Sequence, residues 1–125
     1  MTKKILIIED EPDQAFIFSA RLKANGYETI VANDGEIGLA KIKTEKPDLV
    51  LLDMNIPKIP GAELCEKVKS DNELKNIPII FLSAGNINEI MEISEEAGAD
   101  ACLNKLYDPE ELLETIKKLI KGKHN

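Results

Sequence analysis

Three acidic side chains stand where two short apolar runs end. The run of residues 49–52 ends in Asp53, and the run of residues 5–8 ends in Glu9 and Asp10. Clustered carboxylates repel one another unless a cation lies between them. A ligand set made only of oxygens suits a hard divalent ion such as Mg²⁺, which keeps several of its water molecules. These acids therefore form a candidate metal site, provided that the fold brings the two runs together.

Two further polar side chains follow other apolar runs and could complete a phosphoryl-binding site. Ser83 follows the run that ends at Leu82, and Lys105 comes shortly after the run of residues 101–103. A metal ion and an ammonium group would neutralise phosphoryl oxygens, and a hydroxyl would donate a hydrogen bond to one of them. The carboxylate of Asp53 would then be the nucleophile and form an acyl phosphate. The protein would contribute mainly positioning and charge neutralisation, as in phosphoryl transfer generally.

The elements that must position these residues alternate between strand and helix. Continuous apolar runs are typical of strands that are buried on both faces. Each run is followed by helical periodicity with capping residues, the fourth helix at residues 87–97 and the last one opening with Asp108-Pro109. The predicted strands are residues 5–8, 27–32, 48–53, 76–82 and 101–103.

Five strand–helix units predict an α/β fold, a doubly wound parallel sheet of five strands. Crossovers are right-handed, and the more polar second strand suits an edge, which favours the flavodoxin-like (βα)5 strand order 2-1-3-4-5. In this order the carboxyl ends of the first and third strands meet at a crevice where ligands bind. Glu9, Asp10 and Asp53 would lie there together. We expect residues 1–125 to form a single domain.

Composition excludes several classes of function. The net charge of −7 argues against binding of nucleic acid or of an anionic membrane surface by this domain. Cys65 and Cys102 form no CxxC motif, and His124 is the one histidine, so no zinc site is expected. We expect both cysteines to be small buried residues with reduced thiols. The N-terminal four residues lead into only four apolar residues, too few for a signal peptide or a membrane span, which indicates a cytoplasmic protein.

The sequence resembles the receiver domains of two-component response regulators, and its size is similar to that of the single-domain chemotaxis type. The resemblance covers nearly the whole chain and rests on landmarks in the family's order: Ile7-Ile8-Glu9-Asp10-Glu11-Pro12, Leu51-Leu52-Asp53-Met54-Asn55-Ile56-Pro57, Gly61, Leu82-Ser83-Ala84, Gly98-Ala99-Asp100 and Lys105. It implies a phosphorylation-dependent signalling switch that accepts a phosphoryl group on Asp53 from a histidine kinase or a phosphotransfer protein.

The resemblance also implies what surrounds this reaction. The chain would not be an enzyme beyond self-catalysed phosphotransfer and autodephosphorylation, and its output would be a downstream effector protein. It would be a monomer or a weak dimer that depends on phosphorylation. Asp10 and Asp53 would bind Mg²⁺ directly, with the main-chain carbonyl of Asn55 as third protein ligand and Glu9 acting through a metal-bound water.

On the phosphoryl side, the resemblance implies that Ser83 follows the phosphoryl group and that Lys105 pairs with it. Two residues depart from the family's pattern. The usual Lys-Pro with a cis bond is here Lys105-Leu106, and a non-proline cis bond costs about 3 kcal/mol, so we expect a trans bond. The family's aromatic switch residue is here Cys102, and this puts in doubt the usual coupling of phosphorylation to the surface formed by the last two helices and the fifth strand.

Three alternatives are open on the sequence. A degenerate receiver that acts as a docking module independent of phosphorylation is favoured by Cys102 and Leu106, whereas the complete set of acids, serine and lysine argues against it. A haloacid-dehalogenase-type phosphatase also has an aspartate nucleophile after a strand, but the second acid of that family is here Asn55. A flavodoxin-like electron carrier is disfavoured, because the first loop is acidic where a flavin phosphate needs hydrogen-bond donors.

Overall fold

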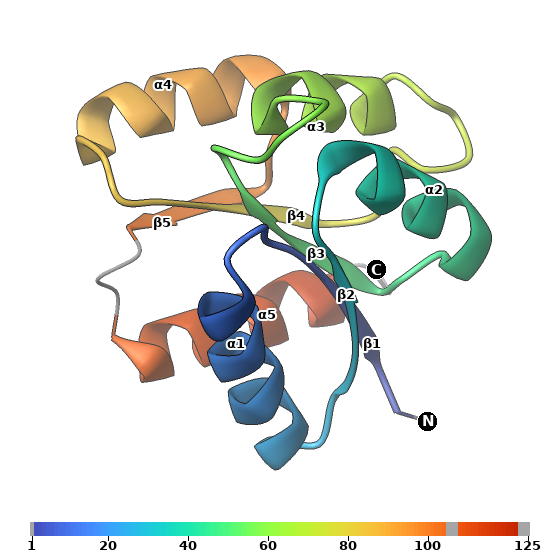
Figure 1. Ribbon diagram of the computed structural model, residues 1–125, viewed down its shortest axis with the longest axis vertical. Helices are drawn as coiled ribbons and strands as arrows, with labels where there is room; N and C mark the ends of the chain where they lie inside the picture. The colour runs from blue at the N-terminus through green and yellow to red at the C-terminus, as the bar shows by residue number, and fades with distance from the viewer. Residues whose placement is uncertain (1, 105–107, 123–125) are drawn as a thin grey trace.

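The chain alternates between strand and helix five times in the computed structural model, which describes residues 2–104 and 108–122 (Figure 1). Lys105, Leu106 and His124 lie outside these residues. The elements are β1 (Lys4–Ile8), α1 (Pro12–Ala24), β2 (Glu28–Ala32), α2 (Gly35–Glu45), β3 (Leu49–Asp53), α3 (Gly61–Lys69), β4 (Ile79–Ser83), α4 (Ile87–Ala97), β5 (Ala101–Asn104) and α5 (Pro109–Gly122).

The five strands form one parallel sheet in the order β2-β1-β3-β4-β5, which confirms the predicted fold class. Ile8 pairs with Leu52 across β1 and β3. Because parallel strands all end at the same edge of the sheet, Glu9 and Asp53 are brought to one crevice between these two strands. The polar strand β2 lies at the sheet edge, as its composition predicts.

Helices cover both faces of the sheet, which explains why the central strands β1, β3 and β4 are mostly apolar. Alternate strand residues point to opposite faces. Leu6 and Ile8 pack on the side of α2, α3 and α4, whereas Ile5 and Ile7 pack with α1 and α5. Figure 1 shows these two layers above and below the sheet. Every residue of β3 is buried, including Asp53.

Local signals in the sequence determine where helices begin and end. Asp34 caps α2, since its Oδ1 accepts a hydrogen bond from the main-chain N–H of Ile37 at 2.8 Å. Asp108 Oδ1 accepts from the N–H of Glu110 at 3.0 Å at the start of α5. Gly98 ends α4 with a φ of 85°, which a glycine adopts without strain. No helix in the described part of the chain has both the length and the apolar character needed to cross a membrane.

The fourth strand begins later than the sequence predicts, at Ile79 instead of residue 76. The preceding residues form turns that bury Leu74 and Ile77. The Nζ atom of Lys69 holds this segment, because it donates hydrogen bonds to the main-chain carbonyls of Lys75 and Ile77 and to Oδ2 of Asp100. Apolar residues here are thus buried by a turn and not by a strand.

Candidate functional site

The three predicted acids lie together. Glu9, Asp10 and Asp53 each present a carboxylate oxygen, and these atoms all lie within 4.8 Å of one another. Glu9 and Asp53 are buried, with 3% and 4% of their surface exposed, whereas Asp10 is exposed. The cluster therefore has two acids fixed in the protein and one facing solvent, as a site open to an incoming ion would require.

Main-chain donors hold the two buried carboxylates. Oε2 of Glu9 accepts a hydrogen bond from the N–H of Glu11 at 3.2 Å, and Oδ1 of Asp53 accepts from the N–H of Asn55 at 3.1 Å. The N–H of Glu9 itself donates to the carbonyl of Ala32 in β2, at 3.0 Å. A buried carboxylate needs such donors, because losing its hydration without replacement is costly. These bonds also orient the side chains toward one another's oxygens.

The loop after β3 is pressed against the start of α3. A Cβ atom added to Gly61 would lie 2.9 Å from the carbonyl oxygen of Asp53 and 2.9 Å from the Cα of Met54, closer than real Cβ atoms come. The N–H of Gly61 donates to the Met54 carbonyl at 3.2 Å. Only glycine allows this approach, so Gly61 helps to hold the main chain around Asp53 and Asn55. Asn55 itself is exposed to solvent.

Ser83 lies at the same edge of the sheet on the neighbouring strand. Asp53 pairs with Leu82 in the register of β3 and β4, and Ser83 follows directly. The Ser83 side chain is buried, and its Oγ accepts a hydrogen bond from the N–H of Gly85 at 3.3 Å. A hydroxyl that accepts one hydrogen bond can still donate its own hydrogen. The predicted role of Lys105 stays a prediction, because Lys105 lies outside the described residues.

The two cysteines differ, which corrects one expectation. Cys65 is fully buried in the core, and burial raises the pKa of its thiol to about 11. Cys102 is only partly buried, so the expectation of a buried residue is wrong there. Burial raises the pKa of the Cys102 thiol, and a hydrogen bond from Ser94 opposes this rise. Its small side chain borders a hollow of about 170 Å³ between α4 and β5.

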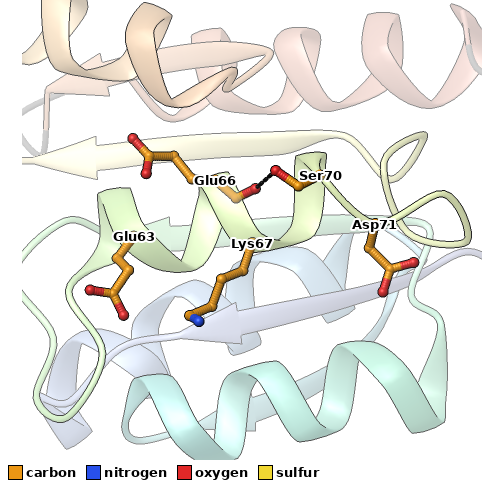
Figure 2. Close-up of a pocket in the computed structure, with 5 residues that line it drawn as sticks. All are labelled: Glu63, Glu66, Lys67, Ser70 and Asp71. Atoms are coloured by element: carbon orange, nitrogen blue, oxygen red, sulfur yellow. Dashed lines mark hydrogen bonds between the residues drawn. The ribbon is translucent and has the colours of Figure 1, made fainter.

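The acid cluster borders a hollow in the surface. This hollow of about 300 Å³ is lined by Glu9 and Asp10, and its other walls include the apolar side chains of Pro12, Phe16 and Val31. Figure 2 shows another hollow, of about 530 Å³ over α3, which the acid cluster does not border; its lining residues are Glu63, Glu66, Lys67, Ser70 and Asp71. The Ser70 hydroxyl there donates to the carbonyl of Glu66, at 2.8 Å.

Sequence reasoning missed one residue near the site, Asn104. Its Nδ2 atom donates a hydrogen bond of 3.4 Å to the carbonyl of Gly85, in the loop that follows Ser83. Ser83 and Asn104 are partners across β4 and β5. The available signal was the position of Asn104 at the end of a strand, directly before Lys105.

Comparison with known proteins identifies sequence relatives. The chain matches the response regulator receiver domain family over residues 5–117. It is 35% identical to the alkaline phosphatase synthesis transcriptional regulatory protein PhoP of Bacillus subtilis, over 97% of this chain and 50% of PhoP. It is 32% identical to the polar-differentiation response regulator DivK of Brucella ovis, over 96% of this chain and 98% of DivK. The chain thus spans half the length of PhoP and nearly all of DivK.

Solved structures agree with these relatives. A putative response regulator from Chloroflexus aurantiacus superposes with a TM-score of 0.91 at 32% identity, covering 97% of this chain and 99% of the other. A CheY-like response regulator receiver domain protein from Methanospirillum hungatei gives a TM-score of 0.90 at 32% identity, covering 99% and 98%. The sheet order, the acid cluster and these matches lead to one conclusion: the chain belongs to the response regulator receiver domain family of two-component systems.

Proposed function

We propose that this chain is a signalling switch in which Asp53 accepts a phosphoryl group in the presence of Mg²⁺. One observation carries the proposal: three carboxylates from two adjacent strands converge within 4.8 Å at the carboxyl edge of the sheet. Membership of the receiver domain family supports the same function. The phosphodonor would be a histidine kinase or a phosphotransfer protein, and the output would be an effector protein. Residues 1–125 would act as one receiver domain, and its two free thiols suit the cytoplasm.

The residues at the site fit Mg²⁺. They supply only oxygen ligands, and the exposure of Asp10 allows a hydrated ion to approach. Asp10 and Asp53 would bind the ion directly, the main-chain carbonyl of Asn55 would be the third protein ligand, and Glu9 would act through a water molecule. The bound ion would neutralise charge on the phosphoryl oxygens.

The chain's own side chains would perform the transfer. A carboxylate oxygen of Asp53 would form a bond to phosphorus while the bond from phosphorus to the donor's imidazole nitrogen breaks, and the electron pair of that bond would stay on the nitrogen. The N–H of Asn55 orients the Asp53 carboxylate for this attack. The Ser83 hydroxyl, held by the N–H of Gly85, would donate to a phosphoryl oxygen. Lys105 would pair with the phosphoryl group.

The test is the intact mass of the protein after incubation with acetyl phosphate and Mg²⁺. We expect one added phosphate on the wild type and none on Asp53→Asn. Asp48→Asn is a matched control, because Asp48 precedes the same strand at its opposite end, where it accepts a hydrogen bond from the N–H of Lys4. It should gain phosphate like the wild type. No phosphate on the wild type, together with no rise in Tm on addition of Mg²⁺, would refute the switch and leave a docking module.

A further inference from the structure

Gly85, in the loop between β4 and α4, is hydrogen-bonded both to Ser83 at the end of β4 and to Asn104 at the end of β5. Its N–H donates to Oγ of Ser83 at 3.3 Å, and its carbonyl accepts from Nδ2 of Asn104 at 3.4 Å. A displacement of the Ser83 hydroxyl toward a phosphoryl group would therefore pull on the peptide groups of Gly85. Through the carbonyl of Gly85, the same displacement reaches the side chain of Asn104 on β5.

Strand β5 also packs on α4, through the side chain of Cys102. Cys102 and Asn104 are two residues apart in β5, so their side chains lie on the same face of the sheet. Cys102 packs against the core on the side of α2, α3 and α4, in the cluster that contains Ala97 of α4, and it lines the same hollow as Ser94 of α4. Ser94 is buried, with 3% of its surface exposed. The two side chains thus connect β5 to the loop and to the helix that follows it.

We propose that Asn104 is a positioning residue that couples phosphorylation of Asp53 to β5 and α4, through its hydrogen bond to the carbonyl of Gly85. This inference rests on the proposed function, because it concerns the response of the fold to phosphorylation. The coupling does not need a large side chain at position 102. The hollow of about 170 Å³ beside Cys102 leaves space in which α4 and β5 can shift relative to each other.

The size of the effect is estimated from the hydrogen bond between Asn104 and the carbonyl of Gly85. A typical hydrogen bond of a protein contributes a net free energy that corresponds to about a five-fold change in an equilibrium. A signal can shift a two-state equilibrium only by the difference in interaction between the two states. Loss of this bond should therefore weaken the response of α4 by about five-fold, and it should leave the phosphoacceptor itself working.

The experiment uses amide chemical shifts in ¹H–¹⁵N spectra before and after addition of beryllium fluoride with Mg²⁺, which mimic a phosphorylated aspartate. The amide of Met54 reports on the site, and the amides of Cys102 and Ser94 report on β5 and α4. In the wild type we expect all three to shift. In Asn104→Ala, the shift at Met54 should be retained, whereas the shifts at Cys102 and Ser94 should fall by at least about two-fold.

Two further variants keep the inference falsifiable. Asn104→Thr retains a strand-forming side chain that is too short to reach the Gly85 carbonyl, and it should behave like Asn104→Ala. Asn25→Ala removes a similar bond far from the site, from Nδ2 of Asn25 to the carbonyl of Arg21, and it should respond like the wild type. Full shifts at Ser94 in both Asn104 variants would overturn the inference alone. Absence of any shift at Met54 in the wild type would overturn the proposed function, and the inference with it.

Discussion

Replacement of Asp10 by Asn should stabilise the protein when no divalent ion is present. Carboxylate oxygens of Asp10, Glu9 and Asp53 lie within 4.8 Å of one another. At this separation two unit charges repel by ~0.9 kcal/mol in water and by ~3.5 kcal/mol at an effective dielectric constant of about 20. Because Asp10 is exposed, the lower value applies to each of its two pairs. The variant should gain about 1–2 kcal/mol at low ionic strength, less after screening by salt.

Thermal unfolding followed by circular dichroism measures this gain. In low salt with EDTA, the Tm of Asp10→Asn should exceed that of the wild type by roughly 4–8 °C. Saturating Mg²⁺ should reverse the order of the two proteins or remove the difference, because under the proposed function Asp10 is a direct ligand of the ion, and an ion that binds only the folded state stabilises it. Added NaCl should shrink the gain seen in EDTA, because mobile ions screen exposed charges.

A matched control separates repulsion within the cluster from a general effect of removing negative charge. Asp13 lies in the first turn of α1 and is not part of the cluster. Asp13→Asn should lower the Tm slightly, because it removes a favourable interaction with the helix dipole. A Tm for Asp10→Asn at or below that of the wild type in EDTA would refute the reasoning, since the three acids would then not repel one another in the folded state.

Three other predictions concern residues outside the acid cluster. Lys69→Met should lower the free energy of unfolding by about 2 kcal/mol in urea denaturation, because it removes the Lys69 donor from two main-chain carbonyls and leaves the Asp100 carboxylate with the N–H of Ile79 but without its ion pair. A loss no larger than the experimental error would contradict this. Gly61→Ala should cost about 1–3 kcal/mol and slow phosphorylation by acetyl phosphate, since the new Cβ would collide with the main chain beside the phosphoacceptor; wild-type values for both would refute it. Burial raises the pKa of the Cys65 thiol to about 11 in the folded protein. The stability linked to this shift is therefore fully present below the pKa of the unfolded thiol, and it is lost as the pH rises toward 11. The wild type should therefore lose about 2 kcal/mol more stability than Cys65→Ala between pH ~9 and ~11, and equal losses would count against the buried thiol.

The sheet and the acid cluster could be predicted from the sequence because both depend on regular patterns. Strands β3 and β4 are apolar up to their last residues, Asp53 and Ser83, and this pattern requires helices on both faces of the sheet. Once the polar strand β2 is placed at an edge, β1 and β3 must be neighbours, and Asp53 then lies beside Glu9. Alternation and polarity therefore determine which residues share the crevice.

The features that the sequence did not predict depend on contacts between distant segments. Leu74 and Ile77 are apolar like strand residues, yet a turn held by Lys69 buries them. The exposure of Cys102 depends on how closely α4 packs on β5, and the bond from Asn104 to Gly85 depends on the register of β5 against β4. No local pattern encodes such distances between elements.

The most direct test of the central claim locates the phosphoryl group chemically. After incubation with acetyl phosphate and Mg²⁺, borohydride reduces an aspartyl phosphate to the alcohol of homoserine, with release of phosphate. Peptide mass spectrometry then identifies the converted residue, and a sample without acetyl phosphate serves as the control. We predict homoserine at position 53 and at neither Asp10 nor Asp48. Conversion of a different acid, with Asp53 unchanged, would contradict the assignment of Asp53 as the phosphoacceptor.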